Sequence, residues 1–290
     1  MLTIEELNCL DLPVWLGNQQ EAGQVLNVTQ SKVSRHNTTC HHIFKALGLR
    51  VAEHNCGYCG DEHGLLVDLR YIHQLNRFML GAGLRIQATC WTRELLLEPL
   101  PPGWVANQAA PHRFNDCQTQ LLLHNHVIDA ALVTAPEAPA PDDPVLCGLV
   151  LYEEPLILAV DRNHALANER GLSAGEIATE SEFAHFTHSS SATRGCAEHL
   201  DQHLMGSPPS RWTSLRREPP KHVRRFSTCT TGLLRPDLVP LDFAIPYTSA
   251  DVLVVRHEWA DHPAISALIS ALKPALVQLQ GKVPDLELRI

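Results

Sequence analysis

The 290-residue sequence lacks the features that would place a protein in a membrane or outside the cell. No apolar run approaches the roughly 20 residues that a membrane-spanning helix needs. The first residues, Met-Leu-Thr-Ile-Glu-Glu-Leu, have neither the basic nor the apolar segment of a secretory signal. The nine cysteines are odd in number and follow no regular spacing, so we expect reduced thiols rather than disulfides. We therefore expect a cytoplasmic protein with no membrane partner.

Cationic charge and nucleotide-binding motifs are also scarce. The net charge of −9 excludes a protein that coats nucleic acid without specificity, because that binding mode neutralises phosphates with Lys and Arg. No glycine-rich nucleotide-binding loop is present. We expect the chain to be no enzyme and to need no cofactor.

One stretch lacks acidic residues altogether. Residues 22–52 contain no Asp or Glu, whereas they contain three histidines and four cations, which are Lys32, Arg35, Lys45 and Arg50. The basic part of an otherwise acidic N-terminal region is therefore confined to one segment.

The same segment has the pattern of a helix-turn-helix. Small residues at 22 and 23 would let two helices cross closely, and Asn27 suits the tight turn between them. Thr29 is expected to open the second helix. We expect the wedge between the helices to be filled by Val25, Val28 and Val33.

The second helix begins with side chains that bind DNA in such motifs. Amide, hydroxyl and guanidinium groups lie on its first turns, the end that enters the major groove. The candidate DNA-binding residues are Gln30, Ser31, Lys32, Ser34 and Arg35.

Flanking patterns complete the N-terminal third. Thr3 and Glu6 have the spacing of a capping box that starts a helix, which Pro13 is expected to kink or end early. The recognition helix should end at Leu47-Gly48, and glycine-rich residues 55–61 indicate a wing or hairpin. Between residues 64 and 81, apolar residues recur at helical spacing with Arg70, His73, Gln74 and Arg77 between them. This apolar stripe predicts a dimer seam formed by Leu65, Leu66, Leu69, Ile72, Leu75, Phe78 and Met79.

The remainder of the chain alternates strands with helices. We expect strands at 84–89, 104–109 and 128–134, with helices at 92–100 and 117–126 between them. A strand pair is expected at 149–160, further strands at 239–255 and a terminal amphipathic helix at 265–279. Such alternation predicts parallel β/α units and an α/β fold.

These stations resemble those of a LysR-type transcriptional regulator along nearly the whole chain. The resemblance rests on Ala22-Gly23, on Leu-Asn-Val-Thr-Gln-Ser-Lys-Val-Ser-Arg at 26–35, on Leu47-Gly48, and on weaker matches at 84–89, 128–133, 154–167 and 232–236. It implies a winged helix-turn-helix at 1–63, a linker helix for dimerisation at 64–82 and an effector-binding domain at 83–290. That domain would consist of two Rossmann-like subdomains of the periplasmic-binding-protein type, one at about 83–150 and 250–280, the other at about 151–249.

The resemblance also implies partners and an effector site. The partners would be double-stranded promoter or operator DNA, a small-molecule effector in the cleft between the subdomains, and further copies of the chain in a homodimer or homotetramer. Free N–H groups and hydroxyls where strands meet helices are ready donors for a small ligand. The candidate effector-binding residues are Thr89, Cys90, Trp91, Thr92, Asn115, Asp116, Ser189, Ser190 and His222.

Two alternative functions stay open at this point. The wing at 55–63 has no Lys or Arg, which favours a ligand-binding sensor with weakened or lost DNA binding. A Cys-x-x-Cys flanked by histidines has thiolate and imidazole ligands of the kind that hold zinc, which would suit a metal or redox sensor. Its candidate ligands are His54, Cys56, Cys59 and His63, although we expect no metal there.

Overall fold

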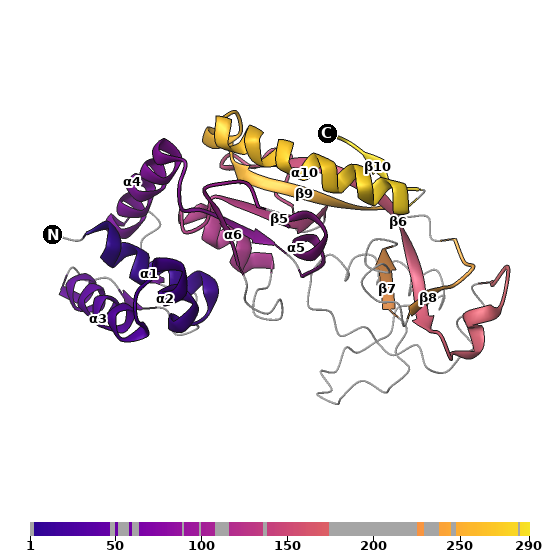
Figure 1. Cartoon of the computed structure of the whole chain (residues 1–290), viewed down its shortest axis with the longest axis horizontal. Coiled ribbons are helices and arrows are strands. Elements are labelled where there is room, and N and C mark those ends of the chain that lie inside the picture. The colour runs from indigo at the N-terminus through magenta and orange to yellow at the C-terminus, as the bar shows by residue number, and fades with distance from the viewer. Residues whose placement is uncertain are drawn as a thin grey trace.

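The computed structural model describes most of the chain in two parts joined by a helix (Figure 1). The described residues are 3–46, 50–51, 58–59, 64–88, 90–98, 100–107, 116–135, 138–173, 225–228, 238–244, 248–283 and 285–290. We call the described residues up to 59 the head and those from 84 onward the body. Helix α4 (Leu65–Leu80) connects them. No helix in these ranges is long and apolar enough to cross a membrane.

Helix α1 (Ile4–Leu16) begins at the predicted capping box. The Thr3 hydroxyl accepts from the Glu6 backbone N–H, and the Glu6 carboxylate accepts from the Thr3 N–H. The expected early end at Pro13 is wrong, because the helix continues to Leu16 and closes on Gly17 in the left-handed conformation. Trp15 and Leu16 are fully buried, so packing holds the turn that follows the proline.

Helix α2 (Gln19–Leu26) and helix α3 (Gln30–Ala46) form the predicted helix-turn-helix. Asn27 makes the turn at a φ of 54°, and the Thr29 hydroxyl accepts from the Lys32 N–H. Val33 is fully buried and Val28 packs against the same cluster. The expectation for Val25 is wrong, because its side chain is 42% exposed on the outer face of α2.

Gly23 is the residue of α2 at which the backbone of the following turn comes close to the helix. The Val28 N–H donates to the Gly23 carbonyl at 2.8 Å, and a Cβ at residue 23 would lie 2.8 Å from the Val28 carbonyl oxygen. The obstacle is backbone, so a side chain at residue 23 would force the turn away from the helix.

A two-stranded antiparallel hairpin follows the helices, as the wing prediction requires. Strand β1 (Arg50–Val51) pairs with strand β2 (Tyr58–Cys59). The expected helix end at Leu47-Gly48 lies outside the described residues.

In helix α4 the polar side is buried and part of the apolar side is exposed, the reverse of what the sequence pattern suggests. Its polar residues Arg70, His73, Gln74 and Arg77 are at most 4% exposed, because they face the head and the body. The apolar residues that lie in contact with solvent are Leu65, Tyr71, Ile72, Met79 and Leu80. Only part of the predicted apolar stripe is therefore buried within the chain, chiefly Leu66 and Phe78.

The buried face of α4 binds the body through the Asp129 carboxylate. Arg77 donates to it from Nε at 2.9 Å and from a terminal nitrogen at 2.7 Å. Gln74 donates at 3.0 Å and the Arg85 backbone N–H at 2.8 Å. At the other end of α4, Arg70 pairs with the buried Asp11 of α1. Ion pairs thus fix the helix to both parts of the chain.

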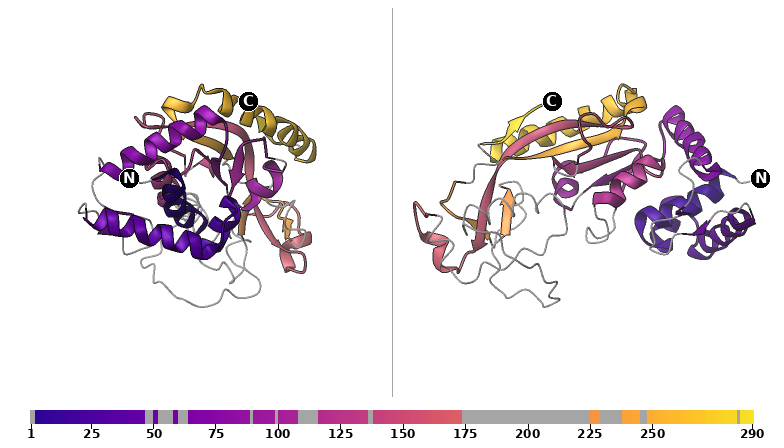
Figure 2. Two further views of the ribbon diagram at one scale, coloured as in Figure 1. Left: turned by 60° about the vertical axis from the view of Figure 1, so that its left-hand side comes forward. Right: turned by 180° about the vertical axis from the view of Figure 1, so that it is seen from behind.

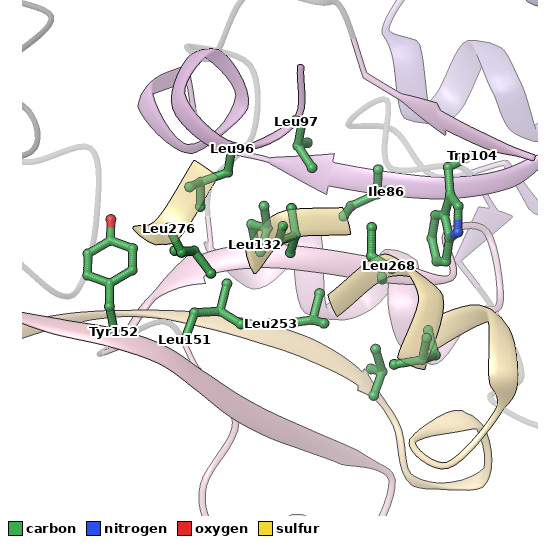
Figure 3. Close-up of a cluster of buried hydrophobic side chains, with 14 of the residues drawn as sticks. Ile86, Leu96, Leu97, Trp104, Leu132, Leu151, Tyr152, Leu253, Leu268 and Leu276 are labelled. Atoms are coloured by element: carbon green, nitrogen blue, oxygen red, sulfur yellow. The ribbon is translucent and has the colours of Figure 1, made fainter. Parts of the chain in front are cut away.

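The body is built on one mixed sheet with the strand order β10-β6-β9-β5-β3-β4. Strands β3 (Leu84–Ala88), β4 (Trp104–Ala106) and β5 (Ala130–Thr134) are parallel, which confirms the predicted β/α units. Helices α5 (Cys90–Leu96) and α6 (Asp116–His124) connect them, and α10 (Pro263–Lys282) is the predicted terminal helix. Figure 3 shows the apolar core, in which Leu268 and Leu276 of α10 lie near Ile86, Leu132 and Leu253 of the strands.

Residues 149–160 form part of one long strand rather than the expected strand pair. Strand β6 (Leu146–Asp161) pairs with β9 (Thr248–Arg256) and with β10 (Glu287–Leu288). A bulge between Val150 and Tyr152 interrupts its pairing with β9. Its far half leaves the main sheet, as both views of Figure 2 show, and pairs with β7 (Arg225–Thr228) and β8 (Leu238–Pro240). A 3₁₀ turn, η3 (Ala165–Asn168), follows it. Most of the predicted second subdomain lies outside the described residues, so the domain boundaries stay a prediction.

The close approach at Gly23 predicts a large effect of a single methyl group. Gly23→Ala should lower the free energy of unfolding by about 1–3 kcal/mol, because the added Cβ meets backbone. The control is Gly281→Ala in α10, where nothing lies within 4 Å of the new Cβ and alanine should be neutral or stabilising. Thermal unfolding of both variants measures the difference. Equal melting temperatures would contradict the role given to Gly23.

Candidate nucleic-acid interface and effector site

The predicted DNA-binding residues lie on the outer side of α3. Gln30, Ser31 and Arg35 are exposed, and Lys32 and Ser34 are half-buried at the edge of the same surface. The opposite side of the helix packs into the head through Val33, Cys40 and Phe44, each with no exposed surface. The helix therefore has a fixed inner face and a free polar face, the arrangement that groove binding requires.

Lys32 already has an anionic partner on the neighbouring helix. Its ammonium lies 2.5 Å from a Glu5 carboxylate oxygen, and both side chains are close to half exposed. The hydrogen bond from Lys32 lowers the pKa of Glu5. Beside this pair, His36 Nδ1 lies 3.8 Å from a Glu6 oxygen. The acidic N-terminus of α1 thus pairs with the first cation of α3, a contact that the linear sequence did not reveal.

Only one of the predicted effector-binding side chains is described. Thr92 lies on the first turn of α5, directly after β3, and its side chain is fully buried. Cys90, Trp91 and Asp116 are placed in helices by their backbones only. The other candidates lie outside the described residues and are Thr89, Asn115, Ser189, Ser190 and His222. Effector contact by these residues stays a prediction.

Sequence reasoning missed a buried polar cluster where β6 leaves the main sheet. Thr134, Tyr152 and Asp251 are cross-strand neighbours on β5, β6 and β9. The Tyr152 hydroxyl donates to Asp251, and the Thr134 hydroxyl donates to the other oxygen of that carboxylate at 3.4 Å. Glu154 and Ser249 pair two residues further along β6 and β9 and are also buried. The alternation of strand residues did not predict that these polar positions would be buried.

Burial, together with the nearby charge of Glu154, raises the pKa of Asp251 to about 7, although the hydrogen bonds from Tyr152 and Thr134 lower it. The carboxyl of Asp251 therefore changes its protonation state near neutral pH. It does so at the crossover between the main sheet and the strands that follow.

Two further patterns have no support as chemical sites. Within the described ranges, no group of three or more His, Cys, Asp or Glu side chains is placed to hold a metal. His54, Cys56 and His63 lie outside those ranges, and Cys59 is placed only as part of β2. The spacing of glycines at 171 and 175 around Ser173 matches a hydrolase elbow, but η3 and a left-handed Gly171 precede Ser173 instead of the strand that an elbow needs.

Comparison with known proteins places the fold. No family model and no curated relative matches the chain. Among solved structures, a mutant OxyR of Corynebacterium glutamicum with hydrogen peroxide bound is similar with 15% identity and a TM-score of 0.51, over 97% of this chain and 95% of that one. A full-length OxyR mutant of Pseudomonas aeruginosa has 11% identity and a TM-score of 0.53, over 94% and 98%. CbnR, a LysR family transcriptional regulator, has 15% identity and a TM-score of 0.51, over 95% and 99%. The chain thus has the fold of full-length LysR-type regulators, which confirms the predicted fold class.

The raised pKa of Asp251 predicts a pH-dependent cost. The folded protein holds a proton that the unfolded chain releases near pH 3.8, so the wild type should lose stability as the pH rises from about 4 to about 7. Asp251→Asn removes the charge and keeps one acceptor oxygen for Tyr152, while its NH2 group can donate to the Thr134 hydroxyl. The free energy of unfolding of this variant should exceed that of the wild type by about 4 kcal/mol at pH 8, and should differ little from it at pH 4.

Denaturant unfolding across this pH range measures the effect. Exposed Asp142→Asn serves as the control for the loss of one carboxylate. A stability difference that stays constant between pH 4 and pH 8 would contradict the raised pKa.

Proposed function

We propose that the chain is a DNA-binding transcriptional regulator of the LysR type, acting in the cytoplasm as a homodimer or homotetramer. The observation that carries this proposal is the free polar face of α3 in a winged helix-turn-helix, with Gln30, Ser31 and Arg35 exposed. Arg donates two bonds to guanine, whereas Gln makes two bonds with adenine by donating to N7 and accepting from the N6 amino group. The solved structure of CbnR, whose described function is transcriptional regulation, supports the assignment through its fold.

The effector would act through the crossover of the body. Strands β6 and β9 run from the main sheet toward the strands beyond it, so the relative position of the two subdomains depends on this crossover. A small molecule bound between the subdomains would favour one orientation by its differential affinity for it. The buried Tyr152 and Asp251 lie on these strands, and Thr134 of β5 bonds to Asp251. The effector is of unknown identity.

The oligomer would form along α4. Leu65, Ile72 and Met79 are separated by seven residues each and are 48%, 61% and 83% exposed. Leu75 falls on the second apolar position of the same heptad and is half-buried. A second copy of the helix would cover this stripe, as the seam prediction requires.

The first experiment tests DNA binding. The full chain is used to enrich double-stranded DNA from a randomised library, and affinity for the enriched fragments is measured at several salt concentrations. Arg35→Ala should weaken binding about tenfold or more and reduce the salt slope, because a guanidinium that contacts DNA is lost. Glu5→Gln should strengthen binding, because Lys32 no longer has a competing carboxylate. Changes between residues 55 and 63 should matter less than Arg35→Ala.

Two control variants separate contact from net charge. Arg170→Ala and Glu98→Gln make the same charge changes at exposed positions of the body. Equal effects at the paired positions would show that only net charge matters and would remove the role of α3. Failure to enrich any fragment, with no salt-sensitive binding at low ionic strength, would overturn the proposed function.

The seam on α4 predicts a second result. Ile72→Asp introduces a charge at the centre of the exposed stripe and should shift the protein to monomers at micromolar concentration, because burying an unpaired carboxylate is costly. Leu121→Asp, at an exposed apolar position on α6, is the control. Sedimentation velocity measures both, and an Ile72→Asp variant with the wild-type oligomeric state would refute the seam.

A further inference from the structure

The middle of helix α1 is buried around its entire circumference. Successive residues of a helix are turned by about 100°, so the four consecutive residues Cys9, Leu10, Asp11 and Leu12 cover the whole circle. Each of these side chains is at most 2% exposed. A head attached to the body only by a linker would bury one stripe of α1 against α2 and α3. Arg70 of the linker helix α4 covers Asp11, so the rest of that side of α1 must have a second packing partner.

The second partner is the body of the same chain. The Trp15 indole N–H donates to the Gln87 side-chain oxygen at 2.8 Å, and the Asn107 amide donates to that oxygen at 2.9 Å. The Asn107 amide also donates to the Trp15 carbonyl at 3.1 Å. Trp15, Gln87 and Asn107 are all buried. These three residues, the Trp15 triangle, join α1 to β3 and to the end of β4.

A second polar contact lies two turns earlier on α1. Arg85 of β3 donates to the Asn8 side-chain oxygen at 2.6 Å and to the Val127 carbonyl at 2.7 Å. Its guanidinium is fully buried, and that burial lowers the pKa of Arg85 to about 9. Apolar contact continues between the two points, because Leu12 and Trp15 belong to the same buried cluster as Leu123 and Ile128 of the body.

Docking leaves the DNA-binding face open. Gln30, Ser31 and Arg35 stay exposed while α1 is enclosed. The contact therefore does not block DNA but sets the direction in which the recognition helix points relative to the body.

The position of Gln87 connects this contact with the candidate effector site. Gln87 is the penultimate residue of β3, and the predicted effector-binding residues 89–92 follow it directly. A displacement at that strand end would move the one acceptor shared by Trp15 and Asn107. We propose that α1 docks the head onto the body of its own subunit, and that Gln87 couples the effector-binding end of β3 to the orientation of the recognition helix. The coupling rests on the proposed function, whereas the docking does not.

Hydrogen exchange on the full chain tests the docking. Gln87→Met keeps the volume of the side chain but removes the shared acceptor, and it should raise the exchange rate of α1 amides about tenfold while β5 and β9 stay protected. Asn8→Ala changes the head side of the interface and should act in the same direction, which covers the case that Gln87→Met fails to fold. Exposed Gln278→Met is the matched control and should change nothing. Exchange of α1 equal to the control in both variants would overturn the docking.

DNA binding tests the coupling. With the enriched fragments, insertion of two base pairs between half-sites should weaken wild-type binding about tenfold, because docked heads have a fixed direction. In Gln87→Met this spacing penalty should fall to about twofold. A loosened α1 with an unchanged spacing penalty would overturn the coupling and leave the docking standing. Wild-type protein that enriches no DNA would overturn the proposed function and the coupling with it, while the exchange result still decides the docking.

Discussion

The buried carboxylate of Asp129 is the constraint on which the arrangement of head, linker helix and body depends. It has no exposed surface in its side chain, so it must be satisfied from within the chain. Its donors come from Gln74 and Arg77 of α4 and from the backbone of Arg85 in β3. Removing one partner of such a pair leaves an uncompensated charge, and this penalty, more than net attraction, holds α4 at one angle. The orientation of α4 then fixes where α1 can lie.

The same carboxylate explains why the environment of α4 was not predictable. Asp129 lies about fifty residues further along the chain than Gln74 and Arg77, and nothing local marks it as their acceptor. Amphipathic periodicity therefore assigned the polar side to solvent. In the structure it faces protein, and Ile72 and Met79 face outward instead. The dimer seam stays a prediction on fewer residues than the sequence pattern indicated.

Features set by neighbouring residues were predictable. The capping box at Thr3, the turn at Asn27 and the parallel β/α order follow from local chemistry and periodicity, and the structure confirms each. The long strand β6 was not, because residues 149–160 have the same apolar pattern whether they form two strands or one that continues through a bulge. The Lys32–Glu5 pair and the Trp15 triangle depend on tertiary contacts between elements, which periodicity does not encode. For the effector site, Thr92 is the one candidate whose side chain the structure describes, and it is buried.

The buried polar groups also separate the parts of the chain that respond to pH from those that do not. The junction around α4 contains three buried arginines against two aspartates, so additional positive charge is unfavourable there. Burial and the charges of Arg85 and Arg77 lower the pKa of His73 to about 2. Burial and the charges of Arg256 and Arg77 lower the pKa of His126 to about 3. His126 donates from Nδ1 to the side-chain oxygen of Gln74, and His73 accepts at Nδ1 from Arg77. The neighbours of each imidazole therefore fix its neutral tautomer. The junction therefore keeps its charge through the physiological range, while the carboxyl of Asp251 titrates within it at the crossover. A change in proton concentration near neutral pH would therefore alter the charge of the crossover and leave the charge of the two junction histidines unchanged.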